Sequence, residues 1–363
     1  MKPTRKLHDL GQSLWLDNIT RELLQSGSLE RYIEELSVTG LTSNPTIFDH
    51  AIRSSGSYDE QIRREAAAGR SPEALFFELA LADVTGAADL FRPTFERTDG
   101  VDGWVSLEVS PLLARETEAT LAAAVDLHRR AARPNLLIKI PGTAEGLPAI
   151  EEAIFAGVPV NVTLLFTPAQ YRAAAEAYLR GIERRIEAGL NPAVASVASL
   201  FVSRWDVAVR GNVPEELLDR LGIAVAGQAY RGYRELLSSA RFQRAANAGA
   251  RAQRLLWAST GTKNPAAPDT LYVTALAAPF TVDTLPESTL LAFADHGTRG
   301  ALMPPDGGDC DAVLARFADA GVNVEALGAR LQDEGAAAFV ASWHDLLDRI
   351  ASKSAAIAAT GQA

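Results

Sequence analysis

Cysteine and long apolar runs are nearly absent from this chain of 363 residues. The chain has one cysteine, Cys310, so it forms no internal disulfide, and a cytoplasmic location is the default expectation. No apolar run approaches the ~18 residues that a membrane-spanning helix needs. The segment Met1–Trp15 contains no continuous apolar stretch of the kind found in secretory signals. We therefore expect neither a membrane partner nor export.

Positive charge is also scarce, because 35 basic residues face 45 acidic ones and the net charge is −10. This balance argues against a nucleic-acid backbone as the main partner, although it leaves room for a local basic pocket that binds phosphate. The apolar fraction of 47% and the charged fraction of 22% are typical of a globular protein with a full core. The length suits either two ordinary domains or one large one.

Several catalytic classes lack their usual residues here. None of the five histidines falls at the end of a predicted strand, and Cys310 lies in a linker. A zinc-dependent aldolase and a histidine-based hydrolase are therefore not expected, and we predict neither a metal nor a cofactor. No Gly-x-Gly-x-x-Gly or Walker pattern follows a predicted strand, which disfavours nucleotide binding.

Lysine is the rarest of the charged residues. The chain uses arginine at 30 of its 35 basic positions, and its five lysines are Lys2, Lys6, Lys139, Lys263 and Lys353. A lysine inside an apolar segment therefore indicates a need for an amine and not merely for a positive charge. Lys139, in Leu-Leu-Ile-Lys-Ile-Pro-Gly, is that lysine.

Short β-type runs alternate with helical stretches along the chain. The predicted strands are Leu14–Asn18, Val38–Asn44, Val105–Ser110, Leu136–Ile140, Val160–Leu165, Val194–Val202, Leu255–Ser259 and Thr281–Thr284. The predicted helices between them include Glu30–Glu35, Glu116–Ala131, Gly146–Ala156, Pro168–Ala188 and Glu215–Gly249. This alternation predicts an α/β fold with a parallel sheet, and eight strands with helical crossovers fit a single (β/α)8 TIM barrel of the class I aldolase type.

The C-terminal part has a different pattern. A turn-rich linker at Pro304–Asp309 precedes three amphipathic segments, which are predicted as the helices Asp311–Asp319, Asn323–Glu334 and Ala336–Lys353. We divide the chain into a barrel catalytic domain over residues 1–300 and a helical C-terminal extension, residues 301–363, that packs on the barrel.

The position of Lys139 is the first functional clue. Strands of a parallel barrel are covered on both faces, so this run offers no easy route to bulk water. Burial disfavours the charged form of an amine, and a neutral amine is a competent nucleophile toward a carbonyl. The alternative is a structural lysine whose ammonium reaches a barrel mouth or pairs with a carboxylate.

Polar residues at the ends of the other strands favour the functional interpretation. Each has a structural alternative, such as a helix cap, a salt bridge or small-residue packing. Catalytic groups of a (β/α) barrel lie at the C-terminal ends of its strands, so side chains from five other strands are expected to converge around the lysine, which makes six strands in all. These side chains are Asp17, Asn44, Glu108, Asn161, Thr163 and Ser199, with Arg204 just after the sixth strand.

This set of side chains supports a narrow range of chemistry. An amine with two carboxylates can form an imine, move protons and cleave a carbon–carbon bond. Asparagine, serine and threonine can hold the hydroxyls of a polyol. Arg204 and Lys263, after the sixth and seventh strands, can hold a phosphate.

The motifs that carry these residues resemble those of transaldolase, in the longer bacterial form without a fused isomerase domain. They occur in the family's order and span roughly residues 7 to 350. They are Leu-Trp-Leu-Asp-Asn from residue 14, Thr-Gly-Leu-Thr-Ser-Asn-Pro from 39, Ser-Leu-Glu-Val-Ser-Pro from 106, Lys-Ile-Pro-Gly-Thr from 139, Asn-Val-Thr-Leu-Leu-Phe from 161 and Ala-Ser-Leu-Phe-Val-Ser-Arg from 198.

The resemblance implies an activity in the non-oxidative pentose phosphate pathway. A dihydroxyacetone unit would pass from sedoheptulose 7-phosphate or fructose 6-phosphate to glyceraldehyde 3-phosphate or erythrose 4-phosphate. Lys139 would form the Schiff base, Asp17 would take the proton of the C4 hydroxyl, and Glu108 with Thr163 would activate a water. The partners would be sugar phosphates only, and the enzyme a monomer or homodimer.

The remaining residues implied by the resemblance bind substrate. Asn44 and Asn161 would hold the dihydroxyacetone part, and Ser199 and Arg204 the phosphate. At the seventh strand many family members have Ala-Ser-x-Arg, whereas this chain has Ala-Ser-Thr-Gly-Thr-Lys from residue 258. Ser259 and Lys263 are assigned to phosphate, with a surface-loop lysine as the alternative for the latter.

Three other functions fit these residues less well. An aldolase that releases free dihydroxyacetone is disfavoured by the length of the chain and by Glu108, where such fructose-6-phosphate aldolases have glutamine. A glycosidase that uses Asp17 and Glu108 leaves Lys139 unexplained, and aromatic residues for sugar stacking make up only 7% of the chain. A non-catalytic sugar-phosphate sensor would not need a lysine with two carboxylates.

Overall fold

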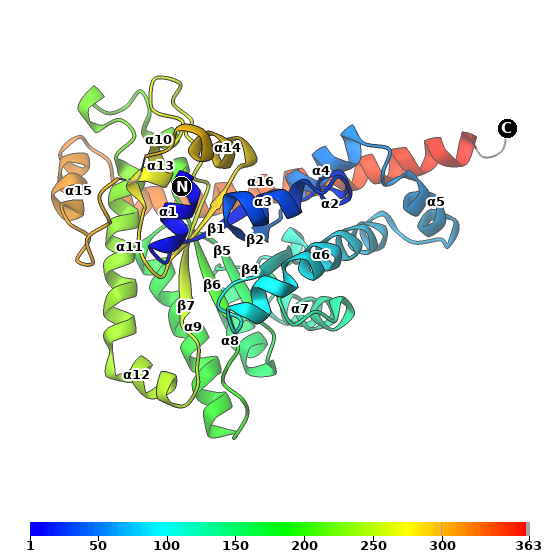
Figure 1. The fold of residues 1–363 in the computed structure, drawn as a ribbon, viewed down its shortest axis with the longest axis horizontal. Coiled ribbons are helices and arrows are strands. Elements are labelled where there is room, and N and C mark those ends of the chain that lie inside the picture. Colours follow the sequence, from blue (N-terminus) through cyan, green and yellow to red (C-terminus); the bar gives the residue numbers. More distant parts are fainter. Residues whose placement is uncertain (299, 361–363) are drawn as a thin grey trace.

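Eight parallel strands close into a barrel in the computed structural model, which describes residues 1–298 and 300–360 (Figure 1). The strands follow one another around the barrel in sequence order, and β8 pairs with β1. They are β1 (Ser13–Asp17), β2 (Val38–Thr42), β3 (Trp104–Glu108), β4 (Leu136–Pro141), β5 (Val160–Leu165), β6 (Ser196–Phe201), β7 (Gln253–Ala258) and β8 (Val282–Leu285). The predicted TIM barrel is confirmed, and every strand begins and ends within two residues of its predicted bounds.

Helices surround this barrel and form its outer layer (Figure 1). In the first half of the chain they are α1 (Pro3–Asp9), α2 (Arg21–Gln25), α3 (Ser28–Leu36), α4 (Pro45–Ser54), α5 (Asp59–Ala67), α6 (Pro72–Arg97), the short η1 (Pro111–Leu113), α7 (Thr117–Ala131) and α8 (Gly146–Ala156). In the second half they are α9 (Pro168–Glu187), α10 (Ser203–Val209), η2 (Glu215–Leu217), α11 (Leu221–Ser238), α12 (Ala240–Asn247), α13 (Leu271–Ala275), α14 (Glu287–His296), α15 (Cys310–Asp319) and α16 (Val324–Thr360). No helix in these described ranges is long and apolar enough to cross a bilayer.

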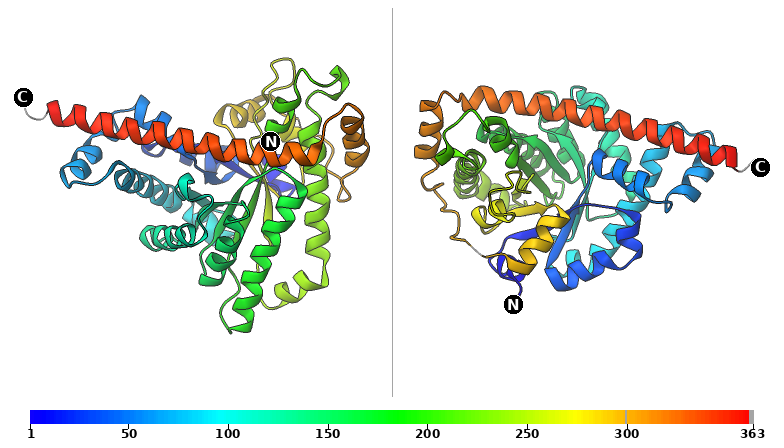
Figure 2. Two further views of the ribbon diagram at one scale, coloured as in Figure 1. Left: turned by 180° about the vertical axis from the view of Figure 1, so that it is seen from behind. Right: turned by 90° about the horizontal axis from the view of Figure 1, so that it is seen from above.

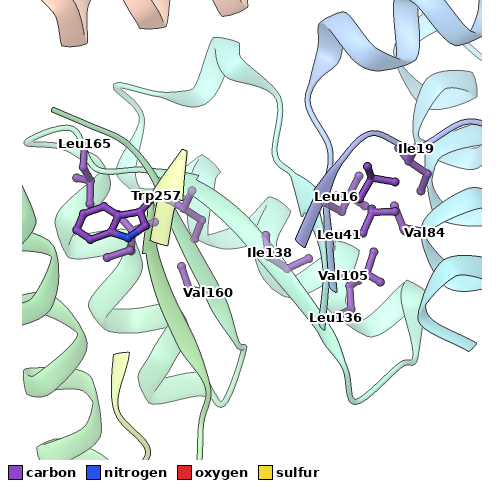
Figure 3. Close-up of a cluster of buried hydrophobic side chains, with 14 of the residues drawn as sticks. Leu16, Ile19, Leu41, Val84, Val105, Leu136, Ile138, Val160, Leu165 and Trp257 are labelled. Atoms are coloured by element: carbon purple, nitrogen blue, oxygen red, sulfur yellow. The ribbon is translucent and has the colours of Figure 1, made fainter. Parts of the chain in front are cut away.

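Strand alternation separates the core from the interior of the barrel. On the outer face, register neighbours are aliphatic and pack under the helices, as Figure 3 shows for the pairs Leu16 with Leu41, Val105 with Leu136, and Ile138 with Val160. Successive residues of a strand point to opposite faces, so the next position along each strand points into the barrel. Lys139, one residue after Ile138, therefore points inward, with Glu108 and Asn161 as its register neighbours.

The predicted extent of the helices is wrong in two parts of the chain. The expected helix Glu215–Gly249 is divided into η2, α11 and α12. The buried Asp206 carboxylate accepts hydrogen bonds from the backbone N–H groups of Leu221 and Gly222, which fixes the start of α11. Ser239 has an extended backbone and its hydroxyl accepts from the Phe242 N–H, so it ends α11 and caps α12.

The second correction concerns the C-terminal extension. The predicted helices Asn323–Glu334 and Ala336–Lys353 form one continuous helix, α16, which passes through Gly335 without a break. Glycine usually weakens a helix interior, but a Cβ added at Gly335 would lie 3.1 Å from Leu164 Cδ2. The close packing of α16 on the barrel therefore offsets the low helix propensity of Gly335.

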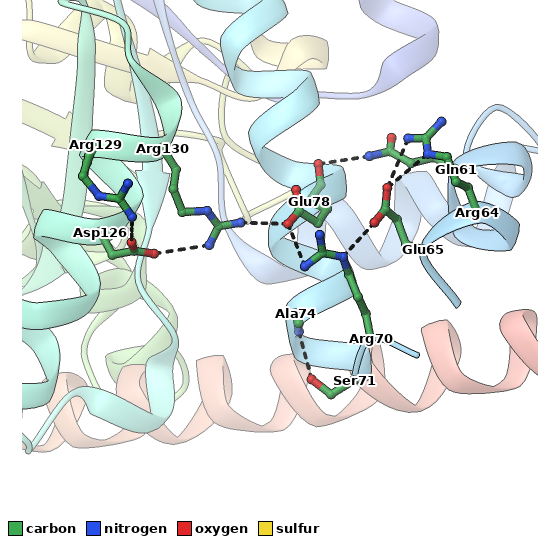
Figure 4. A network of polar contacts seen from close by, with 10 residues as sticks. All are labelled: Gln61, Arg64, Glu65, Arg70, Ser71, Ala74, Glu78, Asp126, Arg129 and Arg130. Carbon is green, nitrogen blue, oxygen red and sulfur yellow. Dashed lines mark hydrogen bonds and ion pairs between the residues drawn. The ribbon is translucent and has the colours of Figure 1, made fainter. Parts of the chain in front are cut away.

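The long helix α16 runs across the molecule, with its C-terminal half beside α4 and α5 (Figure 2). On the neighbouring side of the barrel, ion pairs link α5, α6 and α7 (Figure 4). Glu78 of α6 is their centre, because its carboxylate contacts both Arg70 and Arg130. These side chains lie near the surface and are 13% to 43% exposed, so each pair contributes about 1 kcal/mol or less.

Asp283 on β8 is a costly feature of this core. Its side chain is fully buried, and neither carboxylate oxygen has a hydrogen-bond partner among the described residues. Burial raises the pKa of Asp283 to about 7, and the nearby Thr260 hydroxyl, which donates to the Thr284 carbonyl, opposes this rise only in part. The pKa of Asp283 is thus higher in the folded protein than in the unfolded one. Its contribution to the free energy of unfolding is therefore complete below about pH 4 and is lost as the pH rises through 7.

Asp283→Asn should therefore stabilise the protein in a pH-dependent manner. The amide removes the buried charge, so the gain in the free energy of unfolding should be small near pH 4 and reach at most about 4 kcal/mol at pH 8. Urea unfolding of both proteins at the two pH values measures this difference. Asp126→Asn, at an exposed ion pair, is the control with little expected change. An equal effect of Asp283→Asn at both pH values would contradict the raised pKa of Asp283.

Candidate active site

A cavity of about 280 Å³ opens where the strands end, at the C-terminal mouth of the barrel. Eight of the ten residues predicted for the site line this cavity. They are Asp17, Asn44, Lys139, Thr163, Ser199, Arg204, Ser259 and Lys263. The other two, Glu108 and Asn161, lie behind this lining and contact residues within it.

Lys139 lies on β4, and its side chain is only 7% exposed. Its Nζ donates to Glu108 Oε2 at 3.1 Å and to the Ser43 carbonyl, also at 3.1 Å. The ion pair with a carboxylate, which is the structural alternative for this lysine, is thus present between Lys139 and Glu108. The same amine nevertheless faces the cavity, so the ion pair holds it there and does not take it out of reach.

Opposing influences act on the pKa of Glu108. Burial raises the pKa of its carboxyl, the ammonium and hydrogen bond of Lys139 oppose this rise, and Asp17 reinforces it. Its second oxygen, Oε1, has no hydrogen-bond partner among the described residues. A carboxyl group in this state can exchange a proton with the amine beside it or with a water at the free oxygen.

Asp17 ends β1 and faces the same cavity. Burial raises its pKa, while the Lys139 ammonium, a hydrogen bond from Thr42 and the charge of Lys263 lower it. The Thr42 hydroxyl donates to Asp17 Oδ1 at 2.8 Å and lies 2.6 Å from the Thr284 hydroxyl. Asp17 is therefore oriented by two threonines and lies in the field of two lysines.

Asn161 is the centre of a buried chain of hydrogen bonds. Its Nδ2 donates to Ser106 Oγ at 3.1 Å, and its Oδ1 accepts from Ser199 Oγ at 2.7 Å. Thr163, two residues further along β5, is also fully buried, yet its hydroxyl has no partner within the described part of the chain. Buried hydroxyls are normally satisfied, so this one is available to a ligand or a water in the cavity.

Two further positive charges, Arg204 and Lys263, line the cavity. The side chain of Arg204, on the first turn of α10, makes no hydrogen bond or ion pair with the described residues. Lys263 is exposed, but it is close enough to affect the pKa of Asp17 and is therefore more than a remote loop residue. Ser259 has a left-handed backbone, with φ of 57°, and its hydroxyl lies 2.9 Å from that of Ser203.

Asn44 both caps a helix and lines the cavity. Its Oδ1 accepts from the Ile47 N–H at 3.1 Å, which caps the start of α4. The residue also lines the cavity. A cap of this kind fixes the orientation of the side chain, so the amide is held in place next to Ser43, whose carbonyl accepts from Lys139 Nζ.

Several lining residues were not predicted from the sequence. Thr284 of β8, Phe201 of β6, His50 of α4 and Phe339 of α16 complete the wall. Phe339 is 200 positions from Lys139, and no local motif marks it. Only the packing of α16 over the barrel could have revealed it. Across the described ranges, no group of three His, Cys, Asp or Glu side chains could hold a metal ion.

Comparison with known proteins identifies the family. A family model described as transaldolase/fructose-6-phosphate aldolase matches residues 14–350. A transaldolase of Thermobifida fusca is 47% identical, covering 98% of this chain and 99% of its own length. Those of a Parafrankia strain and of Acidothermus cellulolyticus are 46% and 45% identical, and each covers at least 95% of both chains. The resemblance inferred from the motifs is thus confirmed, and the chain belongs to the transaldolase/fructose-6-phosphate aldolase family.

Proposed function

We propose that this protein is a transaldolase that carries a dihydroxyacetone unit on Lys139. The donors are sedoheptulose 7-phosphate and fructose 6-phosphate, and the acceptors are glyceraldehyde 3-phosphate and erythrose 4-phosphate. One observation carries the proposal: a nearly buried amine faces a cavity, with the carboxylates of Glu108 and Asp17 beside it. Relatives named transaldolase along nearly their full length support the same reaction.

In this mechanism Lys139 Nζ attacks C2 of the ketose and forms a carbinolamine, which loses water to give the imine. Attack requires the neutral amine, and Glu108, at 3.1 Å, is placed to accept its proton. Glu108 Oε1 and the Thr163 hydroxyl, both without partners in the described structure, can hold the water that leaves and later returns.

Asp17 then acts as the base that starts cleavage. It takes the proton of the C4 hydroxyl, the C3–C4 bond breaks, and the electron pair of that bond moves into the imine to give an enamine. The first product leaves as an aldose phosphate. The acceptor aldehyde then undergoes the reverse steps, with Asp17 returning the proton. The Lys139 and Lys263 charges favour the ionised form of Asp17 that the first step needs.

The remaining side chains bind and orient the substrate. Asn44 and Asn161 are assigned to the hydroxyls of the dihydroxyacetone part, and Ser199 is assigned to the phosphate. Arg204, with no carboxylate partner in the described structure, is assigned to the phosphate, and Ser259 and Lys263 assist it. Asn161 holds Ser199 directly, at 2.7 Å, so the two act as one unit.

Release of free dihydroxyacetone is the second candidate activity, because the family description names both reactions. Glu108 favours transfer, since a carboxylate at this position can move protons, whereas an amide cannot. We further propose a cytoplasmic monomer or homodimer in which residues 1–300 provide the catalytic groups and residues 301–363 pack on them. Phe339 is the contribution of this extension to the cavity.

Lys139→Arg should abolish transfer, with a loss in kcat/KM of at least about a thousandfold, because a guanidinium forms no imine. Borohydride treatment with fructose 6-phosphate should attach the three-carbon fragment to the Lys139 peptide of the native protein and to no peptide of the variant. Peptide mass mapping detects the adduct. Lys353→Arg is the matched control and should retain both activity and adduct, since Lys353 binds backbone carbonyls of α4 and the loop after it. An adduct on another lysine would sink the mechanism.

Asp17→Asn should slow cleavage of the C3–C4 bond by about 10² to 10⁴-fold while imine formation continues. The variant should therefore accumulate a donor imine that borohydride traps with all carbons of the donor attached. Rapid-quench kinetics and the mass of the adduct measure the two steps separately. Asp333→Asn, at an exposed carboxylate on α16, is the control. An unchanged cleavage rate in Asp17→Asn would remove Asp17 from this role.

A further inference from the structure

The ring of Phe339 closes the cavity above the lysine. Phe339 comes from α16, is only 7% exposed and lines the same cavity as Lys139. Lys139 Nζ lies over its ring, 5.8 Å from the centroid. The face of an aromatic ring attracts a cation at this distance, so the ring favours an ammonium or an iminium while it displaces water from that side.

Gln332 anchors α16 directly to the catalytic strands. Its Nε2 donates to the Gly142 carbonyl at 3.1 Å and to the Leu164 carbonyl at 2.9 Å. These carbonyls lie at the ends of β4 and β5, the strands that carry Lys139 and Thr163. Leu164 has a left-handed backbone, and the pairing of β5 with β6 shifts there. Gln332 therefore fills a hydrogen-bonding gap at this irregularity and fixes the height of α16 above the cavity.

The helix is also fixed beyond Phe339. The Thr46 hydroxyl, at the rim of the cavity, donates to Ser342 Oγ at 2.9 Å. Further along, Lys353 donates to the Ile52 and Ser55 carbonyls of the α4 region. Phe339 thus lies between anchors on both sides, and its ring is held in place as part of the wall.

The apolar surroundings of Phe339 extend this shielding. Phe166 and Phe201 form a tilted ring pair, with centroids 5.2 Å apart, in the same buried cluster as Phe339. Phe201 lines the cavity as well. The cavity that holds Lys139 and Asp17 is therefore lined in part by aromatic surface, on Phe201 and Phe339.

From this arrangement we propose that Phe339 is a specificity-determining residue that directs the lysine-bound fragment toward transfer. The inference rests on the proposed function. After cleavage, the three-carbon enamine on Lys139 has two fates. It can attack the carbon of an acceptor aldehyde, or it can take a proton at C3 from water and then be hydrolysed to free dihydroxyacetone and the lysine amine. Phe339 disfavours the second fate because it keeps bulk water, the proton source, away from the fragment.

The experiment measures this partition. Phe339→Ala and Phe339→Leu are given fructose 6-phosphate and erythrose 4-phosphate, and both sedoheptulose 7-phosphate and free dihydroxyacetone are quantified. The ratio of release to transfer should rise at least tenfold in Phe339→Ala and about two- to fivefold in Phe339→Leu, which keeps much of the apolar volume. Because the ratio is independent of the amount of folded enzyme, a purely structural role would not change it.

Trp343→Phe is the matched control. Trp343 lies one turn further along α16 and packs on Phe76, with ring centroids 4.9 Å apart, away from the cavity lining. This variant should lower the melting temperature and leave the ratio unchanged. If the native enzyme transfers but the ratio is unchanged in both Phe339 variants, the inference is overturned. If Phe339→Ala does not fold, Phe339→Leu alone decides. An absence of transfer in the native protein would instead refute the proposed function.

Discussion

The structure of the site depends on one constraint, the burial of an amine beside two carboxylates at the end of a closed barrel. Lys139 is almost inaccessible to solvent. Burial raises the pKa of both Glu108 and Asp17, and the Lys139 ammonium is the main influence that opposes this rise. The proton affinities of Glu108 and Asp17 therefore depend on the charge of this amine. Imine chemistry uses this coupling, because the amine loses its positive charge to become a nucleophile and regains one as the iminium.

The closed sheet explains why these groups meet. Glu108 and Asn161 are the register neighbours of Lys139 on the two adjacent strands, so pairing of β3, β4 and β5 in any other register would separate them or turn them toward the helices. The aliphatic pairs on the outer face hold that register through burial (Figure 3). The core and the site therefore lie on opposite faces of the same strands. Packing on the outer face fixes the positions of the site residues on the inner face.

Alternating strands and helices, and polar residues at strand ends, were readable from the sequence because both depend on local patterns. The eight strands and the convergence of Asp17, Lys139 and Thr163 follow from these patterns. Two kinds of feature could not be read. Helix ends at Leu221 and Ser239 are set by capping side chains, one of them on another helix, and α16 continues through Gly335 because of close contact with β5. Phe339 reaches the cavity only through that contact, so its position depends on tertiary packing between segments far apart in the chain.

A half-buried and a fully buried carboxyl group, those of Asp17 and Asp283, show how burial alone differs from a functional site. Asp17 and Asp283 both have their pKa raised by loss of water. Asp17 is compensated by two lysines and a threonine and faces a cavity, so it can gain and lose a proton during a reaction. Asp283 lies outside the cavity lining, has no hydrogen-bond partner in the described structure, and can only cost stability when it ionises. A perturbed pKa therefore marks a catalytic group here only where a compensating charge and an accessible space accompany it, and around Lys139 the barrel supplies both.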